Sequence, residues 1–219
     1  MTNQFIEGID VSSNQGQVDW ERVAGAGKAF AFARATVGGH IADSQFATNW
    51  QGISDAGMLR GAYHFFWPLT PWKEQAENFI KTVGALNPGD LPPVLDLEEA
   101  IPKSDQLKRD VWNDIPANQR LSIIQNWLDE VEQALGMQPM IYTRQNFIEP
   151  LLGDGVKALA TSGLWIAHYN VAQPSTPSSW TSWTFWQYSE TGSIDAVHGN
   201  VDCDRFAGSQ DDLQGLTKS

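Results

Sequence analysis

The sequence predicts a single α/β domain, an eight-stranded barrel whose last third is rich in β-strands. Five short apolar segments with strand character alternate with helical segments, and three further strand segments follow with little helix between them. Alternation of strands and helices favours a parallel sheet. Eight strands are also the number that closes into a barrel filled by its own side chains.

The expected strands are short apolar runs, several with alternating side chains, bounded mostly by turn-forming residues. They are Phe5–Val11, Ala29–Thr36, Leu59–Phe66, Leu91–Glu98, Gln138–Tyr142, Gly163–Tyr169, Trp183–Tyr188 and Gly199–Phe206.

The expected helices carry apolar residues at helical spacing and have start or stop signals. They are Trp20–Ala26 after Asp19, Ser44–Ala56 before Gly57, a helix opened by Thr70-Pro71 that runs to about Leu86, Ala117–Leu135 before Gly136, and a segment with Phe147, Leu151 and Leu152. The polar stretch Glu99–Ile115 is expected to be an irregular excursion over one end of the fold.

Length and composition indicate one globular domain. The chain has 219 residues, of which 42% are hydrophobic and 18% charged. We expect residues 1–208 to form the barrel and residues 209–219 to be a short polar tail. No linker or internal repeat marks a second domain.

The net charge of −12 argues against nucleic acid and anionic membranes as partners, because both attract clustered Lys and Arg. Cys203 is the single cysteine, and no His/Cys cluster suggests a metal site, so we expect no metal and no cofactor. The N-terminus shows no signal peptide and no apolar run approaches membrane-spanning length. We expect a monomer.

The stretch Leu91–Glu99, with the sequence LPPVLDLEE, has the most distinctive chemistry. In a strand, alternate residues share a face, so Asp96 and Glu98 point to the same side. Two adjacent carboxylates disfavour joint ionisation and raise one pKa, as a general acid near neutral pH requires. A strand that runs into a solvated acidic loop is the alternative interpretation of this pattern.

Four acids lie at or near predicted strand ends, where parallel barrels place their chemistry. They are Asp10 on the first strand, Asp96 and Glu98 on the fourth and Asp202 on the eighth. Barrel closure makes the first and eighth strands neighbours, so Asp10 and Asp202 should lie together, across the mouth from the fourth strand. Carboxyl groups that face each other across a pocket are typical of glycoside hydrolysis.

Aromatic residues gather at the same strand ends. Any one of them is more often a core residue than a ligand contact. As a set they are typical of a saccharide groove: Tyr63, Phe65, Trp67, Tyr142, Trp165, Tyr169, Trp186 and Tyr188.

Seven motifs occur here in the order found in the Chalaropsis-type lysozymes of glycoside hydrolase family 25, which the chain resembles from about Gly8 to Phe206. They are GIDVSSNQGQVDW, FARATVGG, MLRGAYHFF, LPPVLDLEE, MIYTR, LWIAHYN and FWQYS with GNVDCDRF. The resemblance implies a TIM-like barrel of the (β/α)5(β)3 type. It also implies an N-acetylmuramidase that cuts the β-1,4 bond between N-acetylmuramic acid and N-acetylglucosamine in peptidoglycan.

The resemblance also implies roles for individual residues. Glu98 is the general acid, Asp96 assists it, and Asp10 and Asp202 complete the acidic pocket. Substrate contacts are expected from residues in the matching motifs: Arg34, where the family usually has Lys, and Tyr63, Phe65, Tyr142, Tyr169 and Gln187. Such an enzyme acts on the cell wall, extracellular or delivered by a phage.

Two positions depart from the family pattern. Val37 replaces an acid in the second motif, and Asp204 stands where Asn is usual in the last. The first departure keeps open a non-catalytic protein that binds wall glycan or belongs to a virion. A family 18 chitinase-like hydrolase, whose strand also ends in acids, is the rival among enzymes, although only the last part of its DxxDxDxE motif is present.

Overall fold

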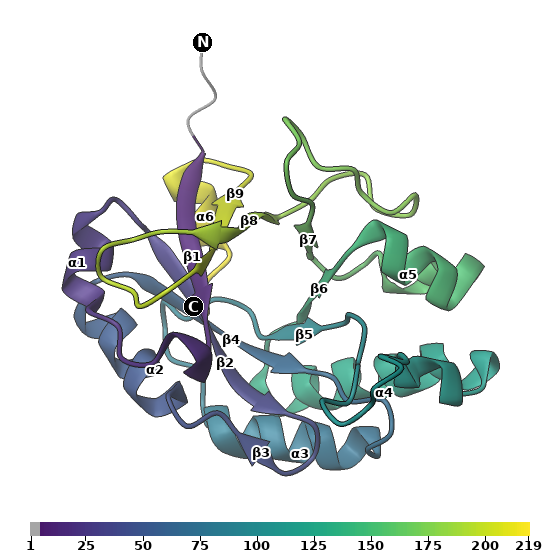
Figure 1. Cartoon of the computed structure of the whole chain (residues 1–219). Helices are drawn as coiled ribbons and strands as arrows, with labels where there is room; N and C mark the ends of the chain where they lie inside the picture. The colour runs from purple at the N-terminus through teal and green to yellow at the C-terminus, as the bar shows by residue number, and fades with distance from the viewer. Residues whose placement is uncertain (1–4) are drawn as a thin grey trace.

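A computed structural model describes residues 5–219, and its centre is a closed barrel of eight strands (Figure 1). Around the barrel the order is β1, β2, β4, β5, β6, β7, β8 and β9, and β1 pairs with both β2 and β9. Their bounds are Ile6–Val11, Phe30–Val37, Leu59–Phe65, Val94–Asp96, Met140–Thr143, Leu164–Ala167, Phe185–Gly192 and Val201–Phe206. The predicted α/β barrel is therefore confirmed.

The barrel strands β1, β2 and β4 to β8 run parallel, whereas β9 runs antiparallel to both of its neighbours. The alternation of strands and helices that predicts a parallel sheet does not extend to this strand. Only residues 193–200 connect β8 to β9, and a connection that short, without a helix, cannot cross over to a parallel position. Asp202 consequently lies near the start of its strand, at the rim where the parallel strands end.

Helices cover the outside of the barrel beside the parallel strands (Figure 1). The α-helices are α1 Trp20–Gly25, α2 Phe46–Asp55, α3 Trp72–Val83, α4 Ala117–Leu135, α5 Gln145–Leu152 and α6 Gln210–Gly215. Short 3-10 turns are η1 Ser13–Gln15, η2 Val111–Asp114 and η3 Gly153–Leu159. No helix within residues 5–219 is long and apolar enough to span a membrane.

Local chemistry explains where the elements begin and end. The Asp19 side chain accepts from the Arg22 amide and caps α1, and Gly136 ends α4 in the left-handed conformation at φ 63°. Pro71 is itself the N-cap of α3, where the sequence suggested Thr70, and the helix ends at Val83 because Gly84 follows at φ 71°. The predicted fourth strand shrinks to Val94–Asp96, since two prolines ahead of it cannot donate to a ladder.

Two elements were not expected from the sequence. The two-residue strand β3, Ile41–Ala42, folds back on the end of β2. Helix α6 lies in the segment expected to be a polar tail. Its Leu213 is fully buried and belongs to the cluster that fills the barrel, while the Lys218 amide donates to the Asp90 carbonyl. The end of the chain thus packs under the barrel.

The core has two layers, one on each face of the strands. An outer layer packs the strands against the helices, with Trp112 and Trp127 among its largest members. The inner layer is mostly aromatic and includes Phe32 stacked on Trp165 at 4.5 Å between ring centroids. These rings fill the lower barrel and leave polar side chains at its upper end.

Candidate active site

A polar pocket opens at the rim where the parallel strands end, with a volume of about 200 Å³. Of the ten site residues predicted from the sequence, the pocket is lined by Asp10, Arg34, Tyr63, Phe65, Asp96, Glu98, Tyr142, Gln187 and Asp202. Tyr169 does not line the pocket but bonds to one of these residues. Val11, Ser12, Asn14, Gln15 and Trp165 also line it, and of these only Trp165 stood out in the sequence, as an aromatic residue at a strand end.

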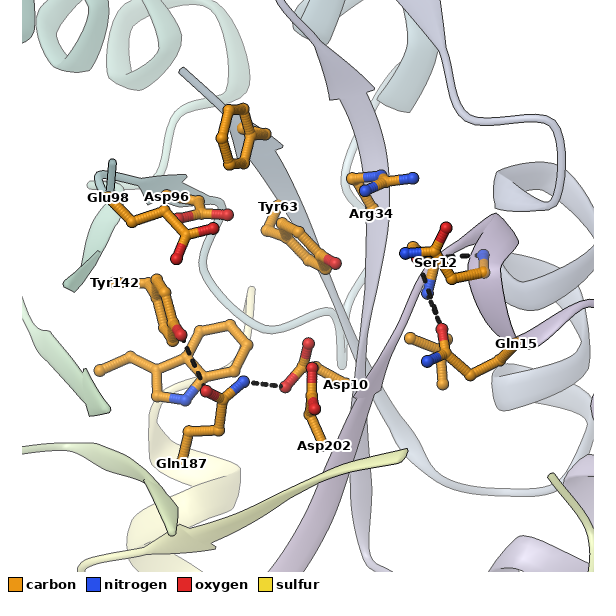
Figure 2. Close-up of a pocket in the computed structure, with 14 residues that line it drawn as sticks. Asp10, Ser12, Gln15, Arg34, Tyr63, Asp96, Glu98, Tyr142, Gln187 and Asp202 are labelled. Carbon is orange, nitrogen blue, oxygen red and sulfur yellow. Dashed lines mark hydrogen bonds between the residues drawn. The ribbon is translucent and has the colours of Figure 1, made fainter. Parts of the chain in front are cut away.

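The acids form two opposing walls (Figure 2). Asp96 is the last residue of β5 and Glu98 follows two residues later, so both side chains reach the pocket from one side. On the other side, Asp10 of β1 and Asp202 of β9 are direct partners in the antiparallel ladder. Direct partners share a face of the sheet, which brings these two carboxyls together at the rim.

Asp96 is buried, whereas Glu98 is half-buried with 30% of its side chain exposed. Burial, more than any neighbour, raises the pKa of Glu98 to about 7, with Glu99, Asp202 and Glu190 adding to the rise. Burial and the charge of Glu98 raise the pKa of Asp96 well above its usual range. The Oδ1 atom of Asp96 has no hydrogen-bond partner among the described residues. Glu98 can therefore hold a proton near neutral pH.

A hydrogen-bond chain fixes Asp10 from below. The Gln187 amide nitrogen donates to Asp10 Oδ2 at 2.6 Å. Its carbonyl oxygen accepts from two hydroxyls, Tyr142 at 2.8 Å and Tyr169 at 2.5 Å. Because two donors occupy the carbonyl end, the amide nitrogen must face Asp10. Burial, then Asp204 and Asp202, raise the pKa of Asp10 well above its usual range, against the lowering effect of the Gln187 bond.

Asp202 is half-buried on the same wall as Asp10. Burial and the neighbouring Glu190 raise its pKa to about 6. Asp202 can therefore exchange a proton in the weakly acidic range.

Arg34 lines the pocket but is already paired. Its Nε donates to Asp43 Oδ2 at 2.9 Å and a terminal nitrogen reaches Ser13 Oγ at 3.3 Å. The Ser13 amide donates to the same Asp43 oxygen at 3.0 Å. Arg34 thereby ties β2 to the turn after β1, and this bracing role was not evident from the sequence.

The turn after β1 supplies polar groups to the pocket wall. Ser12 caps η1, and the Gln15 side chain in turn accepts from the Ser12 amide at 2.9 Å, a reciprocal capping box. The S-x-x-Q spacing is the signal in the sequence that marks this turn. It holds Asn14 and Gln15 at the pocket edge.

Arg144 is the charged neighbour of Glu98 that sequence reasoning missed. It follows β6, pairs with Glu99 and lies 3.7 Å from the Glu98 carboxylate. Its positive charge lowers the pKa of Glu98 and offsets part of the rise from burial. The position of Arg144 in the motif MIYTR, one residue beyond a strand end, is the signal that could have identified it.

The two departures from the family pattern lie in different places. Val37 ends β2 and does not line the pocket. Asp204 is fully buried one layer below the pocket floor, where the Trp165 indole donates to its Oδ1 at 2.8 Å. The extra carboxyl therefore belongs to the support of the site.

Comparisons with known proteins agree with this geometry. The family model described as "Glycosyl hydrolases family 25" matches residues 9–197. The chain is 36% identical to the uncharacterized protein YegX of Escherichia coli O157:H7, over 96% of this chain and 73% of that protein. It is 33% identical to Lysozyme M1 of Streptomyces globisporus, over 98% of this chain and 72% of that enzyme.

A solved structure agrees as well. The bacterial lysozyme from Streptomyces coelicolor superposes with a TM-score of 0.89 at 33% identity, and 98% of each chain is covered. The family match, the relatives and the superposition concern nearly the whole chain. This chain accordingly belongs to glycosyl hydrolase family 25 and is a glycoside hydrolase of the lysozyme type.

Proposed function

We propose that this chain hydrolyses the β-1,4 bond between N-acetylmuramic acid and N-acetylglucosamine in peptidoglycan, with Glu98 as the general acid. The observation that carries the proposal is the half-buried Glu98 beside Arg144, whose pKa rises to about 7 at the edge of a pocket lined by three further carboxyls. A carboxyl with that pKa keeps its proton near neutral pH until the glycosidic oxygen needs it.

In the proposed reaction, Glu98 transfers its proton to the glycosidic oxygen as the bond to the anomeric carbon breaks. The leaving sugar departs as an alcohol, and positive charge develops at the anomeric carbon and ring oxygen. An aspartate on either wall, Asp96 or Asp10, stabilises this charge or orients the group that attacks next. That group is water or the 2-acetamido oxygen of the sugar, and water finally completes hydrolysis.

We assign substrate contact to the aromatic and polar residues on the remaining walls. Tyr63, Phe65 and Tyr142 offer ring faces to a sugar, the two tyrosines add hydroxyls, and Gln187 and Arg34 offer donors. Tyr169 acts from outside the pocket through its bond to Gln187. The proposed partner is a glycan strand of the cell wall, which the protein reaches as a monomer outside the producing cell or after delivery by a phage.

The sharpest test is Glu98→Gln, which keeps the shape of the side chain and removes its proton. Loss of general-acid catalysis costs a factor of about 10²–10⁴ in rate, with an unchanged unfolding curve. Activity should be followed by mass spectrometry of peptidoglycan digests, which identifies the sugar at the new reducing end.

Four outcomes would contradict the proposal. A Glu98→Gln variant that still clears peptidoglycan contradicts the assignment of the acid. Reducing-end N-acetylglucosamine contradicts the assigned bond. Cleavage of chitin but not peptidoglycan identifies a chitinase-like enzyme, and binding of glycan without turnover by the unchanged protein identifies a wall-binding protein.

A further inference from the structure

The carboxyl of Asp204 has no role in the mechanism above, although Asp204 lies on the same face of β9 as Asp202, two residues further along the strand. In the ladders of β9, Asp204 is the partner of Gly8 on one side and of Gln187 on the other. Asp10 is two residues beyond Gly8 on the same strand face. Asp204 therefore lies on the strand between those that carry Asp10 and Gln187.

The hydrogen bonds of Asp204 are incomplete if the side chain is a carboxylate. Its Oδ1 accepts from the Trp165 indole nitrogen at 2.8 Å, and its Oδ2 has no donor among residues 5–219 although the side chain is fully buried. Asp10 is the diagonal neighbour of Asp204 on one face of the β1–β9 ladder, so the two carboxyls point into the same part of the barrel and can approach each other. Two carboxylates cannot bond to each other, but a carboxylate and a carboxylic acid can.

We propose that Asp10 and Asp204 share a single proton in a short-range carboxyl pair, and that Asp204 is thereby a positioning residue for the active site. The pair carries one negative charge in place of two. The inference rests on the proposed function only where it concerns catalysis, because the shared proton itself needs no substrate.

In the proposed arrangement, Asp10 is held by side chains from two other strands. Gln187 binds one oxygen of Asp10 from the side of β8, and the two tyrosine hydroxyls prevent this amide from turning around. The bond to Asp204 holds Asp10 from the side of β9. With both bonds in place, Asp10 faces the pocket in one orientation, next to Asp202.

The charges around the pair favour retention of the proton. Burial raises the pKa of both members well above the usual range, and Asp202 adds to the rise on each. Asp96 also acts on Asp10, and Lys28 acts in the opposite sense on Asp204. The hydroxyls of Tyr63, Tyr142 and Tyr169 also interact with Asp10.

The direct test is a carbon-13 NMR titration of aspartate carboxyls in the full chain, assigned with Asp10→Asn and Asp204→Asn. If the proton is shared, the pair titrates in two well-separated steps. In the upper step, at higher pH, the chemical shifts of both carboxyls change. In Asp204→Asn the upper step disappears, because the amide donates to Asp10 without titrating. The proposal is overturned if the Asp10 and Asp204 carboxyls both complete ionisation in the range of exposed aspartates, or if the upper step survives in Asp204→Asn.

The pH dependence of the stability against unfolding provides a second test, and the direction of the expected change is defined. The folded pair keeps a proton that unfolded aspartates release at a pKa of about 3.9, so wild-type stability falls as pH rises above that value. Asp204→Asn lacks this loss of stability. The Tm of Asp204→Asn minus the Tm of wild type should therefore increase by about 3 °C or more between about pH 5 and about pH 8. Asp195→Asn, on an exposed acid, is the matched control with no such trend.

Activity separates positioning from mere packing. Asp204→Asn should retain cleavage to within about threefold, because its amide can donate to Asp10 and accept from Trp165, whereas the isosteric Asp204→Leu should lose about tenfold or more in kcat. Equal activity of the two variants would reduce Asp204 to a space-filling residue and overturn the positioning role. If Asp204→Leu does not fold, the titration and the Asp204→Asn variant still decide.

The two proposals fail independently. A wild-type protein that shows the upper carboxyl step but does not cleave glycan contradicts the proposed function alone. A wild-type protein that cleaves glycan without the upper step contradicts the shared proton alone.

Discussion

The guanidinium of Arg144 lies 3.7 Å from the carboxylate of Glu98 while it pairs with Glu99. Its charge lowers the pKa of Glu98, and Glu99 raises it. The two residues next to the proposed acid therefore shift its pKa in opposite directions. The value of about 7 results from these two effects together with burial. This arrangement makes the pH range of activity adjustable from outside the pocket.

Arg144→Met should shift the alkaline limb of the pH–activity profile to higher pH. Removing the cation raises the pKa of Glu98, so the acid keeps its proton to higher pH, by about half a unit to one unit. Glu99→Gln should move the limb downward, because it removes a negative charge and frees Arg144 to approach Glu98. The measurement is kcat/KM against pH. Arg22→Met, which breaks an exposed pair with Asp195, is the control, and shifts of both variants in the same direction would contradict the balance.

The effects of removing the two tyrosine hydroxyls that bind Gln187 should not be additive. With either Tyr142→Phe or Tyr169→Phe, one hydroxyl still occupies the Gln187 carbonyl, and each single change should cost about 0.5–1.5 kcal/mol. In the double variant nothing prevents the amide from turning its oxygen toward Asp10. A double-mutant cycle on both stability and kcat should therefore show a coupling of about 1 kcal/mol or more. Simple addition of the two single effects would show that the glutamine is held by something else.

Helix α6 should contribute to stability although it lies at the end of the chain. Leu213→Ala removes a fully buried side chain from the inner core and should lower the free energy of unfolding by about 2–5 kcal/mol. Leu107→Ala is the matched control, because Leu107 is 88% exposed, and should change stability by less than about 0.5 kcal/mol. Urea denaturation checks both, and equal midpoints for the two variants would mean that α6 does not seal the barrel.

The net charge of −12 should make activity on intact walls depend on salt. Walls that carry anionic polymers repel the protein, and moderate ionic strength screens this repulsion, so the rate should first rise with salt. Peptidoglycan stripped of these polymers should show no such rise. A rate on intact walls that only falls as salt is added would contradict this expectation.

Much of the fold follows from local pattern. The strand of Asp96 illustrates this, because alternation within LPPVLDLEE already places Asp96 and Glu98 on the inner side and their leucine neighbours on the outer side. The juxtaposition of Asp10 and Asp202 also followed from closure of eight strands. The direction of β9 did not, because apolar runs have no polarity and only the short connection from β8 decides it.

The sequence by itself determined the barrel, its family and the acids that line its mouth, because these depend on residue type, spacing and the pleat of a strand. The tertiary structure decided how each acid is held. Arg34 is bound by Asp43, Glu98 is flanked by Arg144, and Asp204 lies diagonal to Asp10 across the β1–β9 ladder. Burial and charge pairing join residues that lie far apart in the chain, and it is these interactions, absent from any local pattern, that set the pKa values of the site.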